Sequence, residues 1–140
     1  MPDLLVPFDG SPAALRALDH AIALARQRDG TRLQVLSVLD DVDVDTRELV
    51  AAAEIDRVLA AEAATMLEPA RARLAAAGIA FDCQWIPGAA ARVIADFARE
   101  HRVEQVVMGT RGLGTLPGLL MGSVANRVLQ VVDCPITLVK

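Results

Sequence analysis

Short runs of consecutive apolar residues alternate along the chain with longer segments in which apolar residues recur every three or four positions. Apolar runs bounded by turn residues are typical of buried strands, and the longer spacing is typical of amphipathic helices. The runs predict strands at residues 3–8, 33–39, 79–86, 105–108 and 136–139. The spaced segments predict helices at residues 12–30, 49–77, 89–100 and 123–131.

Turn-forming residues mark several ends of these elements. Ser11 is expected to cap the first helix, with Pro12 at the first helical position. Gly78 suits the C-terminal cap of the second helix. Pro69 lies inside that helix, so we expect either a kink or a break between two helices there. The acidic stretch at residues 40–45 predicts a solvated loop rather than a metal site.

The strands and helices alternate in the order β-α-β-α-β-α-β-α-β. This alternation predicts an α/β fold, in which helices cover both faces of an open, mostly parallel sheet. Right-handed crossovers restrict the topology, and a flavodoxin-like, doubly wound sheet fits best. Ligands of such sheets bind beyond the carboxyl ends of the strands, where the strand order reverses. The loops at residues 9–11 and 109–122 meet there if the first and fourth strands are neighbours.

The composition narrows the class of protein. The chain has 140 residues, of which 54% are hydrophobic and 23% charged, and this predicts a single domain over residues 1–140. The net charge of −4 and the 3% of aromatic residues argue against a nucleic-acid partner. We expect no membrane association, because no apolar stretch reaches the roughly 18 residues of a membrane helix and no signal peptide is recognisable.

Cysteine and histidine usage points to a reduced protein without a metal site of its own. The two cysteines, Cys83 and Cys134, are too few for a disulfide framework, so we expect a cytoplasmic protein. His20 and His101 have no cysteine or histidine partner at ligand spacing, which argues against a zinc site.

The segment from Gly109 to Ser123 carries the strongest functional signal. Its glycines lie between a predicted strand and a predicted helix, which frees backbone N–H groups and lets a ligand approach closely. Ser123 can cap the last helix, and the N–H groups of Ser123 and Val124 lie at the positive end of the helix dipole. Arg111 can neutralise the charge of a phosphate. The segment therefore predicts a phosphate ligand, although it has no Gly-Lys-Ser/Thr motif and glycines that only form turns are an alternative.

The spacing of these residues resembles that of the universal stress protein family, in its nucleotide-binding branch. The family pattern is Gly, two residues, Gly, nine residues, Gly and then Ser or Thr, and Gly109, Gly112, Gly122 and Ser123 match it without departure. The resemblance spans the chain and is weakest over residues 40–77. It implies the strand order 3-2-1-4-5 of adenine nucleotide α-hydrolase-like proteins. Further similar segments lie at residues 5–11, 106–112, 122–125 and 134–136.

The resemblance implies an ATP site, with magnesium as an optional companion of the nucleotide. Gly112, Gly122, Ser123 and Val124 would hold the phosphates and the ribose. Asp9 would contact the nucleoside, although an aspartate there is also a common turn former. Pro7 and Phe8 would form a wall, Val38 would contact adenine and Met108 would line the base pocket. The full set is Pro7, Phe8, Asp9, Val38, Met108, Gly109, Arg111, Gly112, Gly114, Gly122, Ser123 and Val124. Many family members have a histidine before the valine, where this chain has Ser37.

These residues favour an ATP-binding regulatory or stress-response protein that an unidentified protein partner recognises. Hydrolysis is expected to be slow or absent, because the motif supplies phosphate contacts but no evident general base, so we assign no catalytic residue. The alternatives are a slow ATPase or nucleotidyl-transfer enzyme of the same fold, and an interaction module with an empty pocket. The apolar segment 136–140 is a terminal edge strand, and its pairing with a second subunit predicts a homodimer of the kind that the family forms.

Overall fold

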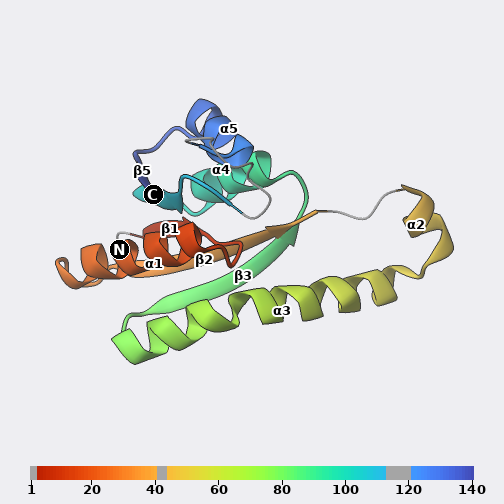
Figure 1. Cartoon of the computed structure of the whole chain (residues 1–140), viewed down its shortest axis with the longest axis horizontal. Coiled ribbons are helices and arrows are strands. Elements are labelled where there is room, and N and C mark those ends of the chain that lie inside the picture. Colours follow the sequence, from red (N-terminus) through yellow and green to blue (C-terminus); the bar gives the residue numbers. More distant parts are fainter. Residues whose placement is uncertain (1–2, 41–43, 113–120) are drawn as a thin grey trace.

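The computed structural model describes residues 3–40, 44–112 and 121–140. At its centre is a five-stranded sheet whose adjacent strands are parallel and whose order is β3-β2-β1-β4-β5 (Figure 1). The strands are β1 (Asp3–Pro7), β2 (Arg32–Leu39), β3 (Phe81–Pro87), β4 (Gln105–Gly109) and β5 (Ile136–Val139). The predicted fold class and strand order are confirmed.

Helices cover both faces of the sheet. One face packs against α1 and α3, and the other packs against α4 and α5, as the two large core clusters show. A short helix, α2, lies with the first turns of α3 beyond one end of the sheet (Figure 1). The helices are α1 (Pro12–Arg26), α2 (Val44–Leu49), α3 (Ala52–Ala77), α4 (Ala90–Glu100) and α5 (Ser123–Val131). In the described part of the chain, no helix is long and apolar enough to cross a membrane.

The core explains why β1 reads as an uninterrupted apolar run. Leu4 and Val6 pack in the cluster on the α1 and α3 face, whereas Leu5 packs in the cluster on the α4 and α5 face. Successive side chains of a strand point to opposite faces, so a strand with helices on both sides needs apolar residues at consecutive positions.

The structure has α3 over Ala52–Ala77, where the sequence predicted a helix over residues 49–77 with either a kink or a break at Pro69, and the break is absent. The helix runs past Pro69 as one element, and Gly78 ends it with a left-handed φ of 69° as predicted. Pro69 is exposed, so its ring faces solvent. Buried residues of α3 continue on both sides of the proline, from Ile55 to Leu74. This packing along the sheet offsets the hydrogen bond that a proline removes from a helix interior.

Several other boundaries differ from the prediction. The acidic stretch is not a loop throughout, because α2 already begins at Val44, while residues 41–43 lie outside the described part. The first strand ends at Pro7 rather than Phe8, and the third begins at Phe81 rather than residue 79. Element ends are set by backbone hydrogen bonds to neighbouring strands, which the apolar pattern alone does not reveal.

The sheet opens where β1 and β4 diverge. These neighbours pair in parallel over Leu4↔Gln105 and Leu5↔Val106, although β1 continues to Pro7 and β4 to Gly109. The chain leaves β1 toward α1 on one face and leaves β4 toward α5 on the other. This is the switch point at which doubly wound sheets bind ligands.

Candidate functional site

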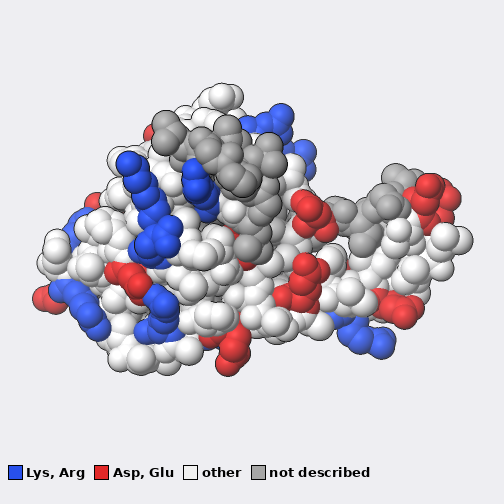
Figure 2. Space-filling model, in the orientation of Figure 1, with Lys and Arg blue, Asp and Glu red and all other residues white. Residues whose placement is uncertain are grey.

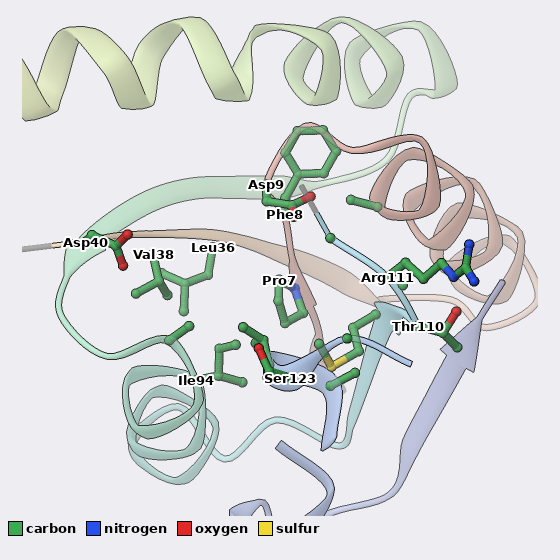
Figure 3. A pocket seen from close by; sticks show the side chains of 18 residues that line it. Pro7, Phe8, Asp9, Leu36, Val38, Asp40, Ile94, Thr110, Arg111 and Ser123 are labelled. Atoms are coloured by element: carbon green, nitrogen blue, oxygen red, sulfur yellow. The ribbon is translucent and has the colours of Figure 1, made fainter. Parts of the chain in front are cut away.

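A cavity of about 540 Å³ lies at this switch point, beyond the carboxyl ends of β1, β2 and β4 (Figure 3). The structure brings to its wall every predicted binding residue that it describes: Pro7, Phe8, Asp9, Val38, Met108, Gly109, Arg111, Gly112, Gly122, Ser123 and Val124. Gly114 lies outside the described residues. The sequence thus located residues that gather around one cavity, and their binding of a nucleotide stays a prediction.

The turn between β1 and α1 forms one wall. The carboxylate of Asp9 accepts a hydrogen bond from the Ser11 N–H at 2.9 Å, and Gly10 takes a left-handed φ of 81° between them. The Ser11 hydroxyl oxygen accepts a hydrogen bond from the Ala14 N–H at 3.1 Å, so Ser11 is the predicted N-cap of α1. Asp9 is therefore a turn former, which was the alternative to ligand contact in the sequence analysis. It also lines the cavity.

Two glycines, Gly109 at the end of β4 and Gly112 after it, allow close contacts with α1 and with the turn before it. A Cβ atom on Gly109 would lie 2.8 Å from the Cβ atom and 2.9 Å from the backbone carbon of Ala13, so the glycine lets α1 pack on β4. A Cβ atom on Gly112 would lie 2.5 Å from Oδ2 of Asp9. Both glycines thus have a packing reason that is independent of any ligand, and Gly112 holds the loop directly against the Asp9 carboxylate.

The start of α5 forms the opposite wall, with one correction to the prediction. The N-cap is Gly122, with extended backbone and no side-chain cap, and Ser123 is the first helical residue. Gly122 donates its N–H to the Thr110 carbonyl oxygen at 2.7 Å and accepts from the Asn126 N–H at 3.1 Å. These bonds fix the beginning of α5 next to the end of β4. The first turn, including Ser123 and Val124, faces the cavity.

Two predicted side chains point elsewhere. Phe8 is 3% exposed and packs in the core cluster of the α1 and α3 face, and Figure 3 shows its ring turned away from the cavity. Its carbonyl oxygen accepts a hydrogen bond from the Ser37 hydroxyl at 2.7 Å. Ser37 therefore holds the Phe8 backbone. The Arg111 side chain points away from Ser123 (Figure 3).

The sequence analysis missed one side of the cavity. Leu36 and Asp40 line it together with the predicted Val38, and Ala90 and Ile94 of α4 lie on the same side. A signal for the first two existed, since residues two apart on a strand share a face. The α4 residues could have been found from the rule that all carboxyl ends of parallel strands meet at one edge. Ala14, Thr110 and Ala125 complete the lining.

The charged residues that line the cavity in the described part of the chain are Asp9, Asp40 and Arg111. No group of three or more potential metal ligands among histidine, cysteine, aspartate and glutamate occurs among the described residues.

The fold and the switch-point cavity define a doubly wound α/β domain, and comparison with known proteins identifies its family. The model of the universal stress protein family matches residues 1–140, and the chain belongs to this family. Universal stress protein YxiE of Bacillus subtilis is 30% identical over 98% of this chain and 97% of its own length.

Solved structures show the same fold. Universal stress protein UspA from Lactobacillus plantarum superposes with a TM-score of 0.86 at 25% identity, covering 99% of this chain and 97% of the other. A universal stress protein in complex with cAMP superposes with a TM-score of 0.74 at 26% identity, covering 99% of this chain and 97% of the other. The family thus includes a similar structure that holds a nucleotide.

Proposed function

We propose that this chain binds ATP in the switch-point cavity and acts as a nucleotide-dependent regulatory module in a stress response. The observation that carries the proposal is the first turn of α5, which faces a cavity whose other side is apolar apart from Asp40. The first N–H groups of a helix lack partners within the helix and favour anions, while apolar walls suit a nucleobase. The volume of about 540 Å³ falls in the range of small-molecule sites.

The cavity residues fit the parts of such a ligand. Backbone groups around Gly112 and Gly122, with Ser123 and Val124, would hold the phosphates and the ribose. Asp9 would contact the nucleoside side, and Val38 would contact adenine. The similar structure in complex with cAMP supports an adenine nucleotide as the class of ligand. Magnesium would be carried by the phosphates, because no ready-made metal cluster occurs among the described residues.

Binding is tested by titrating nucleotide-stripped protein with ATP and magnesium in a calorimeter. We expect saturable binding, and a flat titration at millimolar ATP would overturn the proposal. Gly122→Val should abolish binding, because the valine side chain would crowd the phosphates. The backbone itself is not strained by the substitution, since the φ of −74° at Gly122 is open to any residue. Because Gly122 is buried, a side chain there can also disturb folding. Gly122→Ala therefore serves as a milder variant, and a thermal melt checks that both variants fold. Gln130→Ala, an exposed position near the end of α5, is the control.

We propose further that hydrolysis is slow or absent, and that the bound nucleotide stabilises one state that a partner recognises. The described lining offers Asp9 and Asp40 as its only carboxylates, and Asp9 already accepts the Ser11 N–H. Neither a histidine nor a lysine lines the described part of the cavity. A phosphate-release assay decides the point: release far beyond one equivalent per site would make the protein an enzyme instead.

The edge strand β5 supports the proposal of a homodimer. It lies at the end of the sheet, and its residues are only half-buried. The carbonyl groups of Pro135 and Val139 face β4, so by strand alternation the N–H of Leu138 points outward. Leu138→Pro should therefore weaken a dimer without removing a bond to β4. Light scattering at micromolar concentration is the test, and a monomeric wild-type protein would contradict the proposal.

A further inference from the structure

One side of the cavity is a strip of three side chains that follow one another along β2 and its continuation. Leu36, Val38 and Asp40 all line the cavity, as expected for residues two positions apart on extended backbone. The strip begins with two apolar side chains and ends with a carboxylate. In Figure 3, Asp40 lies beyond Val38, at the opposite end of the cavity from Thr110 and Arg111.

The strip faces the first turns of α4, where Ala90 and Ile94 line the same cavity. The Gly88 N–H donates a hydrogen bond to the Leu39 carbonyl oxygen at 2.9 Å, which ties the start of α4 to the end of β2. The two walls therefore hold a fixed relation to each other. Between them lies an apolar slot with a carboxylate at its outer end. This shape suits a flat ring with apolar faces and a hydrogen-bond donor on its edge.

No hydrogen bond or ion pair links the Asp40 carboxylate to another residue in the part of the chain that the structure describes. Asp40 is exposed, so its charge is stable in water without a protein partner. A carboxylate accepts hydrogen bonds and cannot donate them, and it favours an N–H group over a carbonyl oxygen. Its place at the end of the slot gives it a means of selecting the ring that enters.

We infer that Asp40 determines base specificity by accepting a hydrogen bond from the exocyclic amino group of the bound base. The inference rests on the proposed function, in which the phosphates bind at the glycine loop and the start of α5 and the base binds beside Val38. Asp40 then recognises the amino group of adenine, and a purine without an amino group at that position loses the contact.

The experiment compares ATP with purine riboside 5′-triphosphate, which lacks only the amino group, by calorimetry on nucleotide-stripped protein. Wild-type protein should bind ATP about tenfold more tightly, the lower end of the range for a hydrogen bond to a charged group, because Asp40 is exposed. Asp40→Ala should bring the ratio of the two dissociation constants close to one. Asp40→Asn, which keeps an acceptor without the charge, should give an intermediate ratio.

Asp45→Ala is the matched control. Asp45 is exposed on α2 and is not among the residues that line the cavity. Figure 2 shows several acidic side chains at the end of the molecule that carries α2 in Figure 1. The substitution Asp45→Ala removes the same charge as Asp40→Ala from the same end of the molecule. It should leave the ratio of the two dissociation constants at its wild-type value. A ratio that collapses in Asp45→Ala as well would overturn the inference in favour of a general field effect.

The remaining outcomes separate the inference from the proposed function. If wild-type protein binds neither nucleotide, the proposed function fails. If it binds ATP but the ratio is the same in wild type and Asp40→Ala, the function stands and the role of Asp40 is refuted. If Asp40→Ala tightens both nucleotides equally, Asp40 repels the phosphates instead of contacting the base, and the inference is again refuted.

Discussion

The contact between Gly112 and Asp9 leads to a prediction that separates packing from ligand binding. An alanine Cβ at residue 112 would lie 2.5 Å from Oδ2 of Asp9, closer than carbon and oxygen atoms approach. The backbone of Gly112 does not have a positive φ, so alanine itself is not strained there. The cost of Gly112→Ala is therefore the cost of displacing the Asp9 carboxylate.

The magnitude follows from what holds that carboxylate in place. Overpacking a well-filled site costs about 1–3 kcal/mol. Moving Asp9 also strains its 2.9 Å hydrogen bond from the Ser11 N–H, which is worth about 1 kcal/mol. We expect Gly112→Ala to lower the free energy of unfolding by about 2 kcal/mol and Asp9→Ala to lower it by about 1 kcal/mol. In the double variant the carboxylate is gone, and the alanine at residue 112 should add almost nothing.

The assay is a double-mutant cycle by urea unfolding, followed by circular dichroism. A coupling free energy of about 2 kcal/mol between the two substitutions is expected. Additive costs would refute the argument, because Gly112→Ala would then be destabilising for a reason other than Asp9. Titration of the Asp9→Ala single variant with ATP separates the roles: a variant that folds but does not bind ATP would show that Asp9 acts on the ligand as well.

Other predictions concern the turn, the helix contact and a partly buried thiol. Ser11→Ala removes the oxygen that accepts the Ala14 N–H and should cost about 1 kcal/mol, seen as a melting temperature lowered by about 3 °C, whereas an unchanged melt would contradict the cap. Gly109→Ala crowds the backbone of Ala13 and should cost more than Gly112→Ala in urea unfolding, since a helix backbone yields less than a side chain. Burial raises the pKa of the Cys83 thiol in the folded protein, so as pH rises the unfolded chain loses this proton first. The free energy of unfolding should therefore fall as the pH rises above the ordinary pKa of a cysteine thiol. In reducing buffer, Cys83→Ala should flatten this alkaline decline, and an equally steep decline would assign it to other groups.

The sequence predicted the sheet because its signals are local. An apolar run such as 4–6 with a turn after it indicates a buried strand wherever that strand lies in the sheet. Ser11 with Pro12, and Gly78 after an alanine-rich helix, are likewise local and were confirmed. The strand order, by contrast, came from the family resemblance, since nothing in the strands themselves names their neighbours.

The errors arose where long-range packing decides the local structure. Pro69 is a helix breaker by local chemistry, yet the buried face of α3 continues on both sides of it. Ser123 has the chemistry of an N-cap, but the bond from the Gly122 N–H to Thr110 places the cap one residue earlier. Asp40 looked like part of a solvated acidic run, and only its register on the continuation of β2 brings it to the cavity.

The two ends of the cavity differ in how they depend on sequence. At the α5 end the proposed contacts come from backbone N–H groups, so substitutions there act by blocking approach, as at Gly122, or by shifting the loop, as at Gly112. At the slot end the surface consists of side chains, including Val38 and Asp40. A substitution there changes which ring fits without disturbing the phosphate contacts. Changes of base preference in related chains should therefore fall in the strip after β2 and in the first turns of α4, and not in the glycine loop.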